Sequence, residues 1–316
     1  MADAQLINNV IIDTDVGVDD TFCMANFLTL HRKKRCKVLG ITTVCGNITT
    51  ENAFQSACIL VRDVLKITDV PVFRSGCSEF NDCNCSFFYG QDGHCGTLKK
   101  QSNRLFSTPN QTSEQFLIEQ LKTKQNVTVV AIGPLTNLAK AELLCPGVLK
   151  KCKEIIVMGG TVYEPGNCPK TKMESEYNFG MDGKAAKCVV SSGVNLTLFP
   201  LDVTSSVRFD IIELLNRSSR TKQKEFYKDC IEGTFNAMVL HGETKPEDKR
   251  LTIHDVHCFV YHMNPQLYSI EEMRISVDEE GRVTREKDES QIRPVRVALS
   301  GRDDSEITQL VLGMFE

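Results

Sequence analysis

The chain has 316 residues, of which 41% are hydrophobic and 25% charged, and its formal net charge is −4. This composition is ordinary for a globular protein, and the acidic balance argues against a nucleic-acid partner. No apolar run reaches the length of a membrane span, and residues 1–5 lack the basic and apolar regions of a signal peptide. We therefore expect a cytoplasmic protein that binds neither membranes nor nucleic acids.

Apolar, β-branched runs alternate along the chain with stretches of helical character. The expected strands are Val10–Asp13, Val38–Val44, Val70–Phe73, Val127–Ile132, Glu154–Met158 and Leu196–Phe199. The expected helices are Val18–Leu30, Thr50–Leu65, Ser113–Lys122, Leu135–Leu144, Asp182–Ser191, Thr221–Leu240 and His254–His262. This alternation predicts an α/β fold whose Rossmann-like, mostly parallel central sheet is covered by helices on both faces.

The remaining stretches are a loop-like segment and the C-terminal tail. Residues 74–110 are rich in Gly, Asn, Cys and Ser, a composition typical of a mobile flap over a site. A charged, hairpin-like stretch, Asp278–Asp288, and a helix near Ser305–Met314 are expected to end the chain. Because nothing resembles an interdomain linker or an internal repeat, we expect residues 1–316 to form one domain.

The run from Asp13 to Asp20 places four carboxylates within eight residues, directly after the first expected strand. Like charges this close repel one another, and the usual compensating group is a hard cation with oxygen ligands. A helix-capping role accounts for Asp19 or Asp20 but leaves Asp13 and Asp15 unexplained. The run therefore predicts a metal site at the carboxyl end of a strand, where open α/β sheets bind their ligands.

The chain also contains 14 scattered cysteines, which we expect to be mostly free thiols that act as small hydrophobic side chains. One cluster, with His94 beside it, offers a zinc site as an alternative; its cysteines are Cys77, Cys83, Cys85 and Cys95. Its spacings lack the paired CxxC arrangement of common zinc sites, so we favour the thiol interpretation.

Three further polar motifs directly follow expected strands: Cys45-Gly46-Asn47, Gly133-Pro134-Leu135-Thr136-Asn137 and Gly159-Gly160. Glu176-Tyr177-Asn178 comes later in the chain, and His254-Asp255 opens an apolar helix. Each alone is ordinary turn chemistry, but parallel strand ends meet at one edge of a sheet, so the motifs are expected to converge. In this order, together with the carboxylate run, they resemble the motifs of the nucleoside hydrolase family, of the inosine–uridine-preferring type. The resemblance extends from about residue 10 to residue 260.

The resemblance implies a calcium-dependent hydrolase that splits the N-glycosidic bond of ribonucleosides into free base and ribose, in nucleoside salvage or catabolism. It implies that Ca²⁺ is held by Asp15, Asp20, the backbone carbonyl of Ile132 and Asp255. The residues that match sugar-binding positions are Asp19, Asn47 and Asn178 for the ribose and its surroundings, and Asn167 and Glu176 for the 5′-hydroxyl. Asp15 is implied as the general base, His254 as the acid for the leaving base, and Asp13 as a support. Relatives form homodimers or homotetramers.

The sequence departs from the family most in the expected flap, around residues 87–96. Tyr89 or His94 either contacts the base or is an ordinary loop residue, so a preference for purine or pyrimidine is left open. Two other functions are weighed: a catalytically silent relative that binds a ribosyl ligand or a protein, and an aspartyl-phosphate phosphatase, which also begins with Asp-x-Asp. The later motifs have no place in the phosphatase, and the complete carboxylate set argues against the silent relative.

Overall fold

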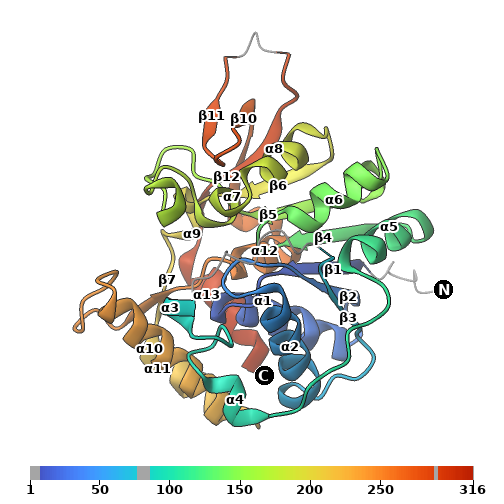
Figure 1. The fold of residues 1–316 in the computed structure, drawn as a ribbon. Coiled ribbons are helices and arrows are strands. Elements are labelled where there is room, and N and C mark those ends of the chain that lie inside the picture. The colour runs from blue at the N-terminus through green and yellow to red at the C-terminus, as the bar shows by residue number, and fades with distance from the viewer. Residues whose placement is uncertain (1–7, 77–85, 288–290, 316) are drawn as a thin grey trace, which may run out of the picture.

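The computed structural model describes residues 8–76, 86–287 and 291–315. Its centre is an eight-stranded sheet in the order β3-β2-β1-β4-β5-β6-β12-β9 (Figure 1). The strands are β1 (Asn9–Thr14), β2 (Lys37–Thr43), β3 (Val72–Arg74), β4 (Val127–Ala131), β5 (Glu154–Met158), β6 (Leu196–Phe199), β9 (Tyr268–Met273) and β12 (Val295–Gly301). All neighbours are parallel except β9, which pairs antiparallel with β12. The predicted α/β fold with a mostly parallel sheet is confirmed.

The central strands are buried on both faces, which explains their nearly continuous apolar sequence. Along β1, Val10 and Ile12 belong to one hydrophobic core and Ile11 to the other. This alternation follows from the two-residue period of a strand, whose successive side chains point to opposite faces. The sheet therefore separates two cores, each of which is covered by helices.

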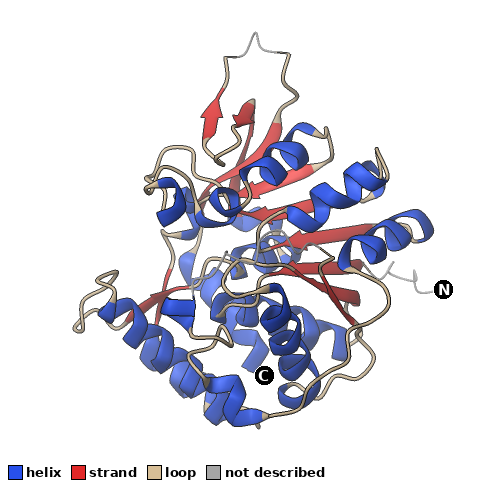
Figure 2. Ribbon diagram, in the orientation of Figure 1, coloured by secondary structure: helices blue, strands red, loops and turns tan. Residues whose placement is uncertain are grey.

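Helices lie on both sides of the sheet, as Figure 2 shows. One face is covered by α1 (Val18–Arg32), α2 (Thr50–Cys58), α12 (Val256–Met263) and α13 (Asp304–Leu312). The other is covered by α5 (Ser113–Thr123), α6 (Thr136–Leu144) and α8 (Gly183–Ser191). The shorter helices are α3 (Ser86–Tyr89), α4 (Thr97–Gln101), α7 (Tyr177–Met181) and α9 (Leu201–Thr204), with single turns at Leu149–Lys151, Pro169–Thr171, Pro265–Leu267 and Gly313–Phe315.

Two elements extend from this layered body. The helices α10 (Ile211–Ser218) and α11 (Lys224–Leu240) are joined to it by an antiparallel ribbon of β7 (Arg208–Asp210) and β8 (Arg250–Thr252). The α11 helix contacts α3 and α4, so the end of α11 lies beside the expected flap (Figure 1). A second ribbon, β10 (Ile275–Val277) with β11 (Val283–Arg285), forms the hairpin predicted for the charged stretch near residue 280.

Some predicted elements differ from the structure. The predicted helix Thr50–Leu65 is α-helical only to Cys58 and continues as a π-helix, Ile59–Val64. The wider turn of this π-helix is seen in the hydrogen bond that the Leu65 N–H donates to the Leu60 carbonyl, five residues earlier. The predicted strand Val70–Phe73 begins only at Val72, since Pro71 has no N–H to donate. The edge strand β9 and its neighbour β12 were not predicted, because their partly exposed residues lack a continuous apolar run. The predicted flap contains α3 and α4, and its residues 77–85 lie outside the described residues, with Cys77, Cys83 and Cys85 among them.

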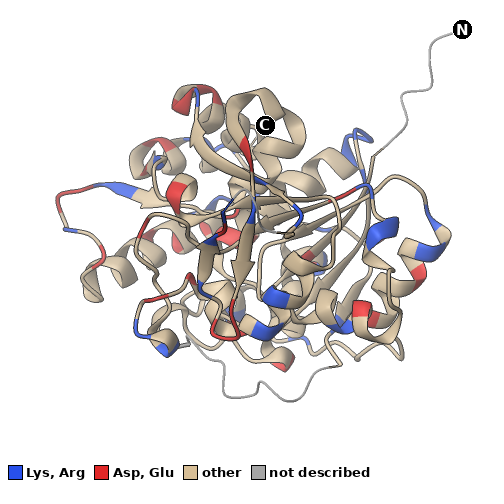
Figure 3. Cartoon of the chain, turned by 90° about the horizontal axis from the view of Figure 1, so that it is seen from above, with Lys and Arg blue, Asp and Glu red and all other residues tan. Residues whose placement is uncertain are grey.

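No helix among the described residues is long and apolar enough to cross a membrane. Acidic and basic residues are interspersed along the outer helices and loops (Figure 3). This distribution agrees with the small net charge of −4.

Candidate active site

A pocket of about 330 Å³ lies at the carboxyl ends of β1, β4 and β5, where the sequence motifs converge. Pockets of roughly 300–1,000 Å³ are typical of small-molecule sites. Its polar lining consists of Asp15, Asp19, Asp20, Asn47, Asn167, Glu176, Tyr177, Asn178, His241, Glu243, His254 and Asp255. Every residue predicted for catalysis, metal binding or sugar binding lines this one pocket, including Ile132, whose backbone carbonyl is a predicted metal ligand.

The loop after β1 turns sharply between the strand and α1. Val16 has a φ of 63°, a left-handed conformation that is costly for a β-branched residue and that is found mainly where a site requires it. This turn lets the Gly17 N–H donate to Asp20 Oδ2 at 2.7 Å, while the Thr14 hydroxyl donates to Asp20 Oδ1. Asp20 therefore both caps the first turn of α1 and presents a fixed carboxylate to the pocket.

The loop after β2 holds the Asp15 carboxylate. The backbone N–H of Asn47 donates to Asp15 Oδ2 at 2.8 Å, and the Asn47 side-chain amide donates to Asp15 Oδ1 at 3.2 Å. The same amide lies 3.4 Å from Asp20 Oδ2, so it bridges the two carboxylates. Gly46 makes this approach possible, since a Cβ there would lie 2.1 Å from Asp15 Oδ2. Two loops that are distant in sequence thus orient one carboxylate.

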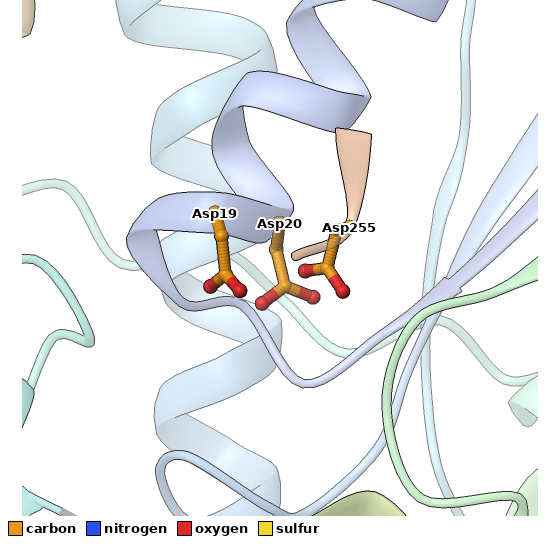
Figure 4. Close-up of side chains that lie close together, drawn as sticks. All are labelled: Asp19, Asp20 and Asp255. Atoms are coloured by element: carbon orange, nitrogen blue, oxygen red, sulfur yellow. The ribbon is translucent and has the colours of Figure 1, made fainter. Parts of the chain in front are cut away.

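Three carboxylates face one another in Figure 4: those of Asp19, Asp20 and Asp255. One oxygen of each lies within 4.8 Å of the others. Burial raises the pKa of Asp20 to about 7, and the nearby charge of Asp19 adds to this effect. Burial raises the pKa of Asp255 well above its ordinary value. Buried like charges of this kind fit a cation, which compensates their repulsion.

The predicted metal ligands all border this cluster, with one difference in detail. Asp20 and Asp255 belong to the closest group of three carboxylates, but its third member is Asp19, which was predicted to bind the sugar. Asp15 and Ile132 line the same pocket. The division of Asp15 and Asp19 between metal and sugar therefore stays a prediction.

Asp13 lies near the end of β1, two residues before Asp15, and is fully buried. Its Oδ1 accepts hydrogen bonds from Thr42 Oγ1 at 2.5 Å and from Asn137 Nδ2 at 2.8 Å. Burial raises the pKa of Asp13 to about 7, and the two hydrogen bonds oppose that rise. These contacts tie β1, β2 and α6 together, and the supporting role of Asp13 stays a prediction.

The α7 helix supplies the opposite wall. Glu176 caps this helix, and its carboxylate accepts hydrogen bonds from the backbone N–H groups of Asn178 at 2.7 Å, Phe179 at 3.0 Å and Gly160 at 2.8 Å. Asn178 is oriented by the carbonyl groups of Met158, 3.2 Å away, and Ile132, 3.4 Å away. Asn167 is exposed at the rim, where its Oδ1 accepts the Tyr177 N–H at 2.7 Å.

His254 and His94 have different surroundings. His254 lines the pocket, and its Nδ1 lies 2.9 Å from the Thr204 hydroxyl. Burial lowers the pKa of His254, whereas the charge of Asp19 opposes that effect. His94 is fully buried outside the pocket lining: its Nδ1 donates to the Asp92 carbonyl at 2.8 Å, which leaves Nε2 to accept from the Thr21 hydroxyl at 2.5 Å. Of the two flap residues considered for base contact, only Tyr89 lines the pocket.

Sequence reasoning missed part of the outer pocket: Phe88, Pro169, Met173, His241 and Glu243. His241 and Glu243 flank Gly242 at the end of α11. A glycine directly after a long helix is a recognisable stop signal, but the sequence contains nothing that indicates which sheet edge the end of α11 would approach. Thr204, the partner of His254, was missed for the same reason.

These features define an α/β protein with an acidic pocket suited to a cation and a polyhydroxylated ligand. The family model of inosine-uridine preferring nucleoside hydrolases matches residues 10–305. The chain therefore belongs to the inosine-uridine preferring nucleoside hydrolase family, and it is a nucleoside hydrolase, an N-glycosyl hydrolase.

Individual relatives agree with this assignment. The chain is 28% identical over 284 residues to a probable uridine nucleosidase 2 from Oryza sativa subsp. japonica, covering 86% of this chain and 79% of the relative. It is 29% identical over 281 residues to an inosine-uridine preferring nucleoside hydrolase from Leishmania major, covering 87% and 85%. In fold it resembles a plant nucleoside hydrolase, with a TM-score of 0.84, 23% identity and 98% of each chain covered. A purine-preferring ribonucleoside hydrolase from Gardnerella vaginalis gives a TM-score of 0.83 at 21% identity, covering 98% and 99%.

Proposed function

We propose that this chain hydrolyses the N-glycosidic bond of ribonucleosides with Ca²⁺ as its cofactor, releasing free base and ribose. The observation that carries the proposal is the pocket floor, where Asp15, Asp19, Asp20 and Asp255 converge. Among the described residues that line the pocket, none is Lys or Arg. Such a floor suits a hard cation and sugar hydroxyls, and it disfavours the phosphate group that a phosphatase would need to bind.

The cation would be held by Asp15, Asp20, Asp255 and the carbonyl of Ile132, with Asp19 beside them. When bound, it supplies a positive charge that lowers the pKa of a coordinated water. The chain's own groups do the rest. Asp15, held by both donors of Asn47, accepts the proton of the attacking water. As the bond to C1′ breaks, positive charge grows on the sugar ring, and the surrounding carboxylates stabilise that charge.

The leaving base has to gain a proton as the glycosidic bond breaks. His254 is the proposed acid. His254 Nδ1 lies 2.9 Å from the Thr204 hydroxyl. In the tautomer in which Thr204 donates to Nδ1, the proton of the neutral imidazole lies on Nε2, where it is available for transfer. We further propose that the chain acts as one catalytic domain and assembles as a homodimer or homotetramer, in the cytosol.

Incubating the protein with a panel of purine and pyrimidine ribonucleosides, and measuring free ribose, tests the proposal. We expect release from at least one nucleoside in the presence of calcium, and loss of that release after chelation. Calcium binding without ribose release from any nucleoside would favour a catalytically silent relative instead.

A further inference from the structure

The outer half of the pocket contains side chains that the proposed mechanism does not use: Phe88, Tyr89, Pro169, Met173, His241 and Glu243. The floor supplies the carboxylates and amides that suit a cation and sugar hydroxyls. A nucleoside whose ribose lies on this floor must direct its base toward the outer half. The outer half therefore decides which base is accepted.

The end of α11 fixes the position of Glu243. Gly242 has a φ of 76°, the left-handed conformation that terminates many helices. The Gly242 N–H donates to the Val239 carbonyl at 3.2 Å, and the Glu243 N–H donates to the Met238 carbonyl at 2.8 Å. This pair of bonds is a Schellman motif, so the backbone of Glu243 has a defined place before any ligand binds.

Aromatic contacts connect this helix end to the pocket floor. The Phe88 ring stacks on His241, with ring centroids 5.0 Å apart, and meets Tyr89 edge-on at 4.5 Å. Tyr89 lines the main pocket together with Asp19 and Glu243, and the charges of both carboxylates add to the burial that raises the pKa of Tyr89. Partial burial also raises the pKa of Glu243 itself, although its residue is still accessible at the mouth.

A second cavity provides space beyond the first. It has a volume of about 280 Å³ and shares Tyr89, Asn167, Glu243 and His254 with the main pocket. Glu243 therefore stands at the boundary between the two cavities, and the proposed acid His254 lines both of them as well. A base that reaches this boundary has room for two fused rings and meets a carboxylate at its outer edge.

We propose that the Glu243 carboxylate binds the leaving base and selects nucleosides whose base presents two adjacent N–H donors, guanosine first among them. This inference rests on the proposed hydrolase function and specifies its substrate class. An ionised carboxylate offers only acceptors. The N1–H and N2–H of guanine match its two oxygens, and hypoxanthine offers N1–H alone. Uracil presents its N3–H between two carbonyl oxygens that repel the carboxylate, while adenine and cytosine place a ring acceptor beside their amino group.

Glu243→Gln tests the proposal, because it keeps the size of the side chain and replaces one acceptor by a donor. At pH 8 the native protein should turn over guanosine with the highest kcat/KM. In the variant this value should fall by roughly 5- to 100-fold, the range expected for a two-bond contact with a base edge. The kcat/KM for uridine should change by less than about twofold, because a single contact to a poorly matched edge contributes little.

Two controls separate this inference from the function on which it rests. Glu247→Gln changes an exposed carboxylate of the same loop that lines neither cavity, and it should leave every rate unchanged. The substrate p-nitrophenyl riboside lacks a base edge, so Glu243→Gln should leave its hydrolysis intact. An equal loss on all substrates, or native preference for uridine or adenosine over guanosine, would overturn the base-binding role while leaving the hydrolase function in place. Failure of the native protein on every substrate would instead refute the proposed function.

Discussion

At the residue scale, backbone N–H groups rather than basic side chains hold the pocket carboxylates in place. Asp20 accepts from Gly17, Asp15 from Asn47, and Glu176 from the first turn of α7. Such donors orient a carboxylate but carry no full positive charge, so the repulsion between neighbouring carboxylates remains. This arrangement explains why burial leaves several of these pKa values raised, and why a cation is the natural complement of the site.

The acid role that we propose for His254 makes a prediction at the same scale. His254→Ala should slow guanosine and inosine hydrolysis by about 10²-fold or more, because general acid catalysis contributes roughly 10²–10⁴ in rate. Hydrolysis of p-nitrophenyl riboside should change little, since its leaving group needs no proton. Steady-state rates on the two kinds of substrate provide the measurement. Equal slowing of both would show that His254 positions the sugar instead.

At the element scale, the loop before α4 packs against the backbone of the first motif. Gly93 has a φ of 71°, and a Cβ there would lie 2.2 Å from the Val16 carbonyl oxygen. Asp92 fixes this loop by accepting N–H donors from His94 and Gly96. The short helices of the predicted flap thus support the strained turn that presents Asp15 and Asp20.

Gly93→Ala tests this support. The substitution should displace the Val16 turn, lower the Tm clearly and weaken calcium binding several-fold. Overpacking destabilises the fold by about 1–3 kcal/mol, in addition to the cost of placing an alanine in the left-handed conformation. Gly96→Ala is the matched control: its φ is 81°, but nothing lies within 4 Å of the added Cβ. Gly96→Ala should lower the free energy of unfolding by only about 1–2 kcal/mol and leave the calcium affinity unchanged. Equal effects of both variants on calcium affinity, measured by calorimetry, would contradict the packing argument.

The sequence indicated the sheet and the pocket floor because their signals are local. Apolar strands followed by Asp15 or Asn47 show both a strand end and its chemistry in a few residues, and Asp255 stands at the opening of an apolar helix. The outer pocket differs, because Glu243 reaches it only through the placement of the α10–α11 arm, which depends on tertiary packing. Thr204 likewise reaches His254 only through the placement of α9. His94 shows the reverse case: its loop suggested a contact with the base, whereas the structure buries it against Thr21.

At the scale of the whole molecule, metal binding and protonation are linked. Burial raises the pKa of Asp20 to about 7 in the metal-free protein, so the folded state holds a proton that the unfolded state has lost above its ordinary value of 3.8. The contribution of Asp20 to the free energy of unfolding is fully present below pH 3.8, and it is lost as the pH rises through about 7. A cation requires the ionised form and opposes the loss.

The Tm gained on adding calcium should therefore be larger at pH 8 than at pH 5.5. Thermal melts at the two pH values, each with calcium and with chelator, measure this gain. Comparing the loaded with the metal-free protein at one pH cancels the contributions of ion pairs far from the pocket. A gain that is equal at both pH values would show that the carboxylate cluster does not bind the cation.

The central claim is that the protein hydrolyses nucleosides at the carboxylate floor, with Asp15 as the general base. Measuring ribose release by the Asp15→Asn variant tests this claim most directly. The substitution keeps the size of the side chain and removes its ability to take a proton. At saturating calcium, with circular dichroism verifying the fold, we predict a loss in kcat of about 10³-fold or more on the best native substrate. A folded variant that releases ribose within tenfold of the native rate would contradict the account.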